Sequence, residues 1–301
     1  MKVCYYPGCT LKADANRFEE SARDALASFG VELEEPSRWT CCGTVFSLSD
    51  DNVMNHLAPV RNLLRARQAG HSRMMILCSM CFNTLARANK LFREDAAKRE
   101  KIIGIMDRED QAYDGGTDVV HALQILKNDI GLEAIREKAA GRLKGIAVAA
   151  YYGCMLLRPD GIGIDEPESP RIFEDVMEAA GARVVSFPYF GECCGAYQTV
   201  ENPDVVGERT RVILDSARAS GADALVVSCP LCAFNLDQRQ AAARKIYPNF
   251  ESLPVLYFTE LLAPAFGLEY RAEWLSTHYA PVTGVLEKAG IHPAGTVEVG
   301  A

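Results

Sequence analysis

The chain has 301 residues, of which 49% are hydrophobic, and a formal net charge of -8. At roughly 150 residues per domain, this length indicates two domains or one large one. The acidic balance argues against a general nucleic-acid binder, which normally has a basic surface. No stretch approaches the ~20 apolar residues that cross a bilayer, and Pro7 and Gly8 interrupt any signal-peptide core. We therefore expect a cytoplasmic protein without a membrane span.

Strand and helix patterns alternate along the first half. We expect strands over residues 1–6, 31–33 and 74–77 and helices over residues 17–29 and 53–67. The helix at 17–29 is indicated by apolar residues on one face and by Gly30 as a stop.

The second half repeats this plan. We expect strands over 146–151, 183–187 and 224–228 and helices over 171–180 and 205–219. Alternation of this kind predicts an α/β fold of two duplicated half-domains, with mostly parallel sheets covered by helices.

Further helix is expected to close each half, at 92–141 and at 251–269. The first domain would span residues 1–144, and the second would span 145–301. The second includes a C-terminal tail after Tyr270, which has no clear motif and is expected to dock on a partner.

The eleven cysteines are the unusual feature of the composition. In a long chain without an export signal, closely spaced thiols indicate metal binding or redox chemistry more than a disulfide framework. Leaving Cys4 aside, each half contains a Cys, then a Cys-Cys-Gly, then a Cys-x-x-Cys. The intervals are 31 and 35 residues in the first half and 38 and 34 in the second.

The sequence around the cysteines repeats as well. Residues 3–9 align with 148–154, and residues 66–78 align with 217–229. A period near 150 residues is too long for a solenoid and indicates two similar half-domains. The counterpart of Cys4 is Ala149, so Cys4 is expected to be a small buried residue rather than a ligand.

The repeated cysteines follow predicted strands. Cys9, Cys78, Cys154 and Cys229 each come just after a strand end. Because sites in parallel sheets form at the carboxyl ends of the strands, these residues could converge.

Ligand number separates the possible metals. Structural zinc takes four ligands, and a conventional iron–sulfur cube also takes four thiolates, whereas each half offers five. Adjacent side chains diverge, so Cys41 and Cys42 suit two irons of one cluster better than one small ion. Zinc in one half remains an alternative, and so does a thioredoxin-type dithiol at each Cys-x-x-Cys, although the dithiol leaves six matched cysteines unexplained.

The doubled pattern resembles the CCG domains in the family of B-type subunits of heterodisulfide reductase, over roughly residues 1–268. The resemblance implies a noncubane [4Fe–4S] cluster in each half and disulfide reduction between the two clusters. The implied ligands of the first cluster are Cys9, Cys41, Cys42, Cys78 and Cys81. Those of the second are Cys154, Cys193, Cys194, Cys229 and Cys232. The resemblance implies that all ten cysteines are also catalytic, through the clusters that they bind.

The resemblance also implies partners. The chain has no Cys-x-x-Cys-x-x-Cys run, so further clusters would come from a ferredoxin-like iron–sulfur subunit of the family's C type, joined to a flavoprotein of its A type. The substrate would be a small disulfide, and Lys12 and Arg158, which follow Cys9 and Cys154, could pair with an acidic group on it. Two other functions stay open: a non-catalytic electron-relay subunit of a flavin-based complex, and a subunit of the thiol-dependent fumarate reductase type.

Overall fold

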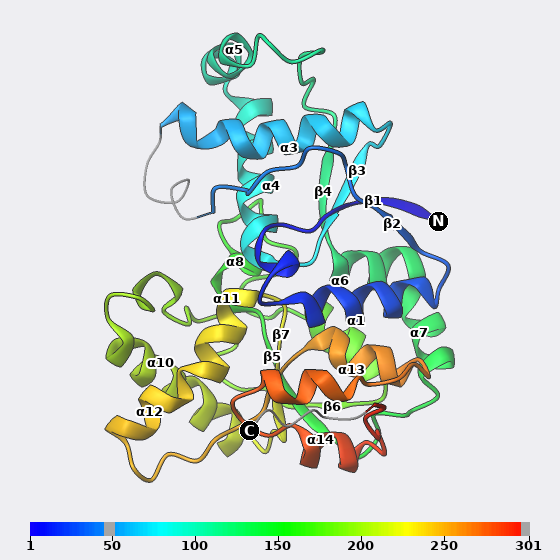
Figure 1. Cartoon of the computed structure of the whole chain (residues 1–301), viewed down its shortest axis with the longest axis vertical. Coiled ribbons are helices and arrows are strands. Elements are labelled where there is room, and N and C mark those ends of the chain that lie inside the picture. The colour runs from blue at the N-terminus through cyan, green and yellow to red at the C-terminus, as the bar shows by residue number, and fades with distance from the viewer. Residues whose placement is uncertain (45–51, 296–301) are drawn as a thin grey trace.

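The computed structural model describes residues 1–44 and 52–295 and contains two four-stranded sheets, one in each half of the chain (Figure 1). All strand pairs within the two sheets are parallel. The first sheet has the order β2-β1-β3-β4, with strands β1 (Lys2–Tyr6), β2 (Glu32–Glu34), β3 (Arg73–Ile76) and β4 (Asp118–His121). The second has the order β6-β5-β7-β8, with strands β5 (Ala147–Tyr151), β6 (Arg183–Val184), β7 (Ala224–Val227) and β8 (Val255–Tyr257).

The strand registers of the two sheets agree with the repeat seen in the sequence. Cys4 pairs with Met74 in the first sheet, and its counterpart Ala149 pairs with Leu225 in the second. Cys4 is fully buried, as expected for a residue whose counterpart is alanine. The predicted α/β fold of two duplicated half-domains is therefore confirmed.

Helices cover the faces of both sheets. Those of the first half are α1 (Asn16–Ala27), α3 (Leu57–Gln68), α4 (Ser79–Glu94), α5 (Ala96–Ile105), α6 (Ala122–Gln124) and α7 (Leu132–Ala139). Those of the second are α8 (Gly153–Leu157), α9 (Ile172–Ala179), α10 (Pro203–Ala219), α11 (Pro230–Ala233), α12 (Gln240–Ile246), α13 (Phe258–Ala265) and α14 (Thr283–Lys288). Short 3-10 turns occur at Thr10–Lys12, Val53–His56, Ala196–Gln198 and Ala272–Thr277, and π-helical turns at Ile125–Gly131 and Phe234–Gln238.

Further helix closes each half as expected, but each segment also contains a strand that was not predicted. Residues 92–141 contain β4 and residues 251–269 contain β8. These strands have four and three residues, no fewer than several strands that were predicted, so their length alone does not explain why they were missed. Each is followed at once by a helix that starts with a capping box, His121 with Gln124 and Tyr257 with Glu260, which hid the strand behind a helical pattern.

The two halves pack through their helices, as the blue α1 beside the orange α13 shows in Figure 1. Ser21 Oγ lies 2.6 Å from Thr259 Oγ1, and the rings of Phe18 and Tyr257 stack with centroids 4.2 Å apart. The packing is reciprocal, since α9 contacts α7 of the first half.

The tail after Tyr270 packs on its own chain as far as Gly295. Arg271 forms ion pairs of 2.8 Å with Glu20 and with Asp24 on α1, and the Trp274 indole N–H donates to Glu20. This part of the tail is therefore held on α1, and its docking on a partner stays a prediction. In the described part of the chain, no helix is both long enough and apolar enough to cross a membrane.

Candidate metal centres at the junction of the halves

Sheet order explains why cysteines far apart in the sequence meet. β1 and β3 are neighbours at the point where the strand order changes direction, and Cys9 and Cys78 follow their carboxyl ends. Cys154 and Cys229 follow β5 and β7 in the same way. Crevices at such switch points are the usual ligand sites of open parallel sheets.

The five thiols of the first set lie in close pairs. Cys9 Sγ is 3.8 Å from Cys41 Sγ, and Cys42 Sγ is 3.3 Å from Cys81 Sγ. The Cys78 thiol is within hydrogen-bonding reach of Cys81. Cys9 and Cys41 are exposed, whereas the other three are buried.

The second set repeats this arrangement in a more enclosed setting. Cys194 Sγ is 3.5 Å from Cys232 Sγ, and the thiols of Cys154 and Cys193 are within hydrogen-bonding reach. All five thiols line one small cavity, together with residues that include Met80 of the first half.

Matched tyrosines hold the two Cys-Cys-Gly loops. Tyr6, at the end of β1, donates from its hydroxyl to the carbonyl of Thr40, just before Cys41, at 2.8 Å. Tyr151, at the end of β5, donates to the carbonyl of Glu192, just before Cys193, at 2.5 Å. The sequence analysis aligned these tyrosines but did not predict that they anchor the loops.

Matched glycines leave room beside the thiols. Gly8 and Gly153 have positive φ values of 72° and 61°. A Cβ at Gly8 would lie 3.1 Å from Cys81 Sγ, and one at Gly153 would lie 3.5 Å from Cys232 Sγ. A larger residue would strain the backbone at both positions, and its Cβ would crowd the Cys81 thiol at Gly8 and the Tyr151 ring, 3.2 Å away, at Gly153.

The two sets meet at their Cys-x-x-Cys turns. Cys78 and Cys229 lie at the starts of these turns, and each shifts the pKa of the other. The adjacent hydroxyls of Ser79 and Ser228 lie 2.6 Å apart, and Ser79 N donates to Ser228 O at 3.1 Å. The ten cysteines thus form two groups, which are adjacent at these two turns.

Neighbouring thiols shift one another's pKa. Hydrogen bonds from Cys41 and Cys81 lower the pKa of Cys42 against the opposing effect of burial. Hydrogen bonds from Cys232 and Cys78 lower the pKa of Cys229 well below its ordinary value. Each set therefore combines a thiol of lowered pKa, which favours the metal-binding thiolate, with neighbours such as Cys81 and Cys232 whose pKa is raised.

The donor sets suit a soft metal with several coordination positions, because each consists of thiols alone in a crevice where glycine leaves space. Within residues 1–44 and 52–295, no three His, Cys, Asp or Glu side chains converge as ligands of a single ion. Pairs of sulfurs distributed over one crevice fit a multi-iron cluster better than one tetrahedral zinc.

The two cations predicted beside the site are engaged with acidic side chains. Lys12 Nζ lies 2.7 Å from Glu19 and 2.5 Å from Glu35. Arg158 is largely exposed and lies 3.5 Å from Glu168. Each is joined to a cysteine of its own set by its backbone, since Lys12 N donates to Cys9 O at 3.3 Å and Arg158 N donates to Cys154 O at 3.1 Å.

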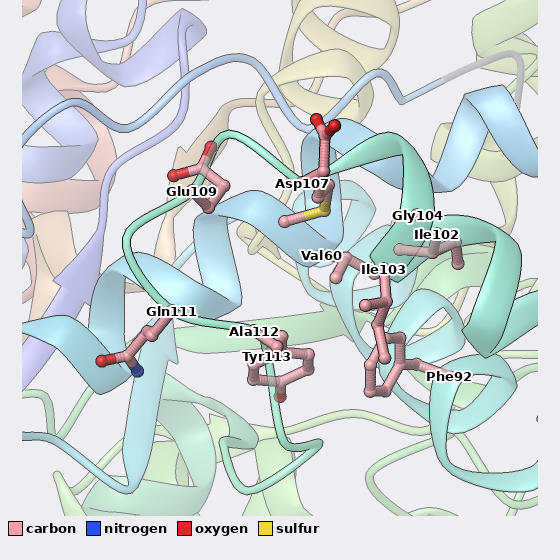
Figure 2. A pocket seen from close by; sticks show the side chains of 11 residues that line it. Val60, Phe92, Ile102, Ile103, Gly104, Asp107, Glu109, Gln111, Ala112 and Tyr113 are labelled. Atoms are coloured by element: carbon pink, nitrogen blue, oxygen red, sulfur yellow. The ribbon is translucent and has the colours of Figure 1, made fainter.

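An apolar pocket of about 300 Å³ lies apart from the cysteines (Figure 2). Residues of α4 and α5, including Phe92 and Ile102, line it together with Tyr113. Its lining contains no cysteine, so we do not assign it to the chemical site.

The matched cysteine loops agree with a known family model. Residues 3–86 and 148–237, more than half of the chain, match the model of the CCG cysteine-rich domain. The chain belongs to the CCG cysteine-rich family. The two matches confirm the duplication on which the resemblance to the B-type subunits of heterodisulfide reductase rests.

Several named proteins align with almost the whole of this chain. It is 30% identical to the 8-methylmenaquinol:fumarate reductase membrane anchor subunit of Wolinella succinogenes, over 89% of this chain and 93% of the relative. It is 27% identical to the B-type subunit of the ferredoxin/F420H2-dependent CoB-CoM heterodisulfide reductase of Methanosarcina acetivorans, over 88% and 89%. It is 26% identical to an Archaeoglobus profundus protein named as similar to the B-type subunit of heterodisulfide reductase, over 89% and 92%.

A solved structure shares the fold. The crystal structure of a hypothetical protein from Helicobacter pylori superposes with a TM-score of 0.72 at 14% identity. The match covers 94% of this chain but only 52% of the other, so this CCG chain spans about half of that protein.

Proposed function

We propose that the chain is the iron–sulfur subunit of a heterodisulfide reductase-like complex and that it reduces a small disulfide. The observation that carries this proposal is the meeting of the two Cys-x-x-Cys turns, where Ser79, the residue after Cys78, bonds to Ser228, the residue before Cys229. Relatives named as the B-type subunits of heterodisulfide reductases support the reaction class.

Each set would hold one noncubane [4Fe–4S] cluster, with the residues of the first set Cys9, Cys41, Cys42, Cys78 and Cys81 and those of the second Cys154, Cys193, Cys194, Cys229 and Cys232. Bound clusters would supply the two electrons that, with two protons, convert one disulfide into two thiols. Tyr6 and Tyr151 would fix the Cys-Cys-Gly loops, while Gly8 and Gly153 keep the space beside the thiols open.

The partners would be a ferredoxin-like iron–sulfur subunit of the C type and a flavoprotein of the A type. The chain lacks a ferredoxin motif of its own, so electrons from a two-electron donor would have to arrive through other subunits. Relatives whose names include ferredoxin as the electron donor support this arrangement.

A second function is favoured by one relative. The 30% identical protein is named as the membrane anchor of an 8-methylmenaquinol:fumarate reductase, a reaction without a disulfide. In that case the chain would relay electrons between partner subunits and would not bind a disulfide.

A single-turnover assay distinguishes the two functions. The native complex, purified and reduced anaerobically, is mixed with bis(hydroxyethyl) disulfide, and the thiols released are counted. We expect two thiols for each disulfide consumed. Reoxidation by fumarate with no thiol released would support the relay and refute disulfide reduction.

A further inference from the structure

The two flanks of the junction differ, although the repeats supply the same positions to both. On one flank, Asn83 of α4 donates from Nδ2 to the carbonyls of Met155 at 2.9 Å and Arg158 at 2.5 Å. These bonds tie α4 to α8 and to the residue after it. We call this flank closed because α4 and α8 are in direct contact here.

The opposite flank has an open pocket of about 470 Å³. The counterpart of Asn83 is Phe234, which lines this pocket and is 43% exposed. Thr10, the residue after Cys9, lies on one wall, and Pro230 and Leu231, between Cys229 and Cys232, lie on another. The pocket therefore borders loops of both cysteine sets.

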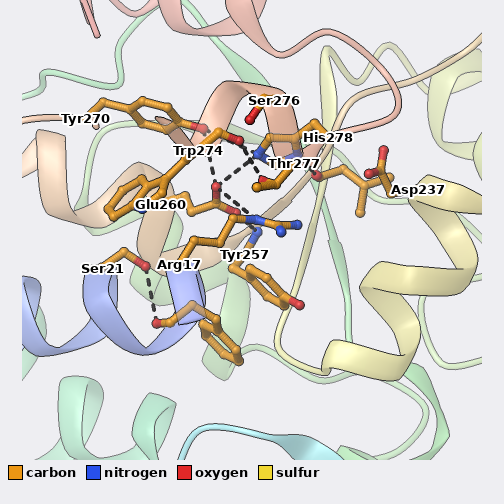
Figure 3. A network of polar contacts seen from close by, with 12 residues as sticks. Arg17, Ser21, Asp237, Tyr257, Glu260, Tyr270, Trp274, Ser276, Thr277 and His278 are labelled. Carbon is orange, nitrogen blue, oxygen red and sulfur yellow. Dashed lines mark hydrogen bonds and ion pairs between the residues drawn. The ribbon is translucent and has the colours of Figure 1, made fainter. Parts of the chain in front are cut away.

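Arg17 lines the same pocket from the first turn of α1 and is only 7% exposed. Its Nε lies 3.5 Å from Glu260 Oε1 without forming a hydrogen bond, and its Cζ lies 5.0 Å from the centre of the Tyr257 ring. Figure 3 shows the head of the guanidinium turned away from Glu260, on the side where Asp237 lies. Within the described part of the chain, neither of its terminal nitrogens has a hydrogen-bond partner.

Glu260 is held by other donors, so it does not consume the hydrogen-bonding capacity of Arg17 (Figure 3). His278 Nε2 lies 3.0 Å from Glu260 Oε1, the Tyr270 hydroxyl lies 3.3 Å from it, and Tyr257 N donates to Oε2 at 2.8 Å. These hydrogen bonds hold the Glu260 carboxylate in place beside Nε of Arg17.

Two other acidic groups face the pocket. Asp237 is buried and accepts hydrogen bonds from the backbone N–H groups of Tyr279 and Ala280, while Asp14 is exposed at the rim. Neither forms an ion pair with Arg17. A buried guanidinium with unused donors is costly unless a ligand completes it.

We propose that this pocket binds the carboxylate of an acidic organic substrate and that Arg17 is its anchor. The terminal nitrogens of a guanidinium match a carboxylate in a bidentate manner. Pro230, Leu231 and Phe234 provide apolar walls for the body of such a molecule. The inference rests on the proposed function, because it assigns the substrate of that site as a carboxylate-bearing disulfide.

Three probes separate the carboxylate from the disulfide: dithiodipropionate has both, suberate has only carboxylates, and bis(hydroxyethyl) disulfide has only the disulfide. We expect wild-type complex to bind dithiodipropionate and suberate in calorimetry. Arg17→Gln should weaken both by ~10- to 100-fold, the range of a charged hydrogen-bonded contact. Arg136→Gln, on α7 and outside the pocket lining, is the control and should change neither.

A second pair of variants does not depend on the buried network. Phe234→Glu and Phe234→Gln have nearly equal shape and both remove the ring beside Arg239, but only one adds a negative charge at the pocket. Suberate should bind at least ~5-fold more weakly to Phe234→Glu, since like charges about 4 Å apart repel by this much even when fully screened by bulk water. The cleavage of bis(hydroxyethyl) disulfide should be equal in the two.

The outcomes separate the two proposals. Unchanged suberate affinity in Arg17→Gln, equal affinity in the two Phe234 variants, or no binding to the wild type would overturn the carboxylate site, whether or not the neutral disulfide is cleaved. Binding of suberate with the expected variant pattern, but without cleavage of any disulfide, would leave the site standing and refute disulfide reduction.

Discussion

Tyr6 in the first repeat and Tyr151 in the second each hold a Cys-Cys-Gly loop by its backbone, and Gly8 and Gly153 each leave space beside a thiol. The repeats differ just after the Cys-x-x-Cys turns. There Asn83 closes one flank of the junction, and its counterpart Phe234 lines an open pocket on the other. Features that position thiols have thus been retained in both copies, whereas features that control access have diverged. The comparison supports the proposal of two similar metal centres, with an open pocket on one flank of their junction.

The largest effect is expected from removing one thiol in either repeat. Cys42→Ala and Cys194→Ala should each reduce single-turnover disulfide cleavage to background, because neither set suffices alone for a two-electron reduction. Cys4→Ala is the control, since Cys4 is buried outside the sets and its counterpart is already alanine. Full activity in either of the first two variants, with the other centre intact by spectroscopy, would refute the equivalence of the repeats.

The capping positions after β4 and β8 offer a second comparison, because the first has the neutral Gln124 and the second has Glu260. Glu260→Gln keeps the cap but leaves Arg17 without its buried counter-charge. We expect a loss of about 3 kcal/mol in the free energy of unfolding at pH 7, measured by urea denaturation.

The loss should depend on pH. Burial alone would raise the pKa of Glu260, but His278, Arg17 and the Tyr257 N–H bring it below its ordinary value of 4.5. A carboxylate with a depressed pKa stabilises the fold above its unfolded pKa, and that stability disappears as the pH falls through the folded pKa. The gap between wild type and variant should narrow below about pH 4.5, and a gap independent of pH would show that the charge of Glu260 contributes nothing.

Asn83, on the closed flank, and Phe234, on the open flank, should differ in their contribution to the free energy of unfolding. Asn83→Ala removes both bonds to the α8 region and should cost about 2 kcal/mol. Phe234→Ala, at the exposed counterpart, should cost less than about 1 kcal/mol. Equal costs in urea denaturation would contradict the assignment of one closed and one open flank.

The smallest effects are expected for the loop tyrosines. Tyr6→Phe and Tyr151→Phe each remove one hydrogen bond to a loop carbonyl and should each cost about 1 kcal/mol in thermal or urea unfolding. Tyr5→Phe is the matched control, because the buried Tyr5 hydroxyl has no hydrogen-bond partner in the described structure, so its removal should be neutral or stabilising. A large difference between the Tyr6 and Tyr151 variants would show that the loops are held unequally.

The sequence allowed the duplicated α/β fold and the convergence of cysteines to be predicted, because both follow from local periodicity and from strand ends. It did not allow β4 and β8 to be predicted, since each of these strands runs directly into a helix that starts with a capping box. The pocket at Arg17 also escaped prediction, because it depends on α1 packing against α13, about 240 residues later in the chain. Lys12 and Arg158 were chosen for their closeness to cysteines in sequence, whereas the buried Arg17 lies next to the open pocket.

The most direct test of two equivalent centres is metal and sulfide analysis of protein purified without oxygen. Two four-iron clusters predict about eight irons and about eight sulfides per chain. Cys42→Ala and Cys194→Ala should each retain about half of both if the centres are independent. Stoichiometric zinc with little iron or sulfide would contradict the account, and iron in one half beside zinc in the other would contradict the equivalence of the repeats.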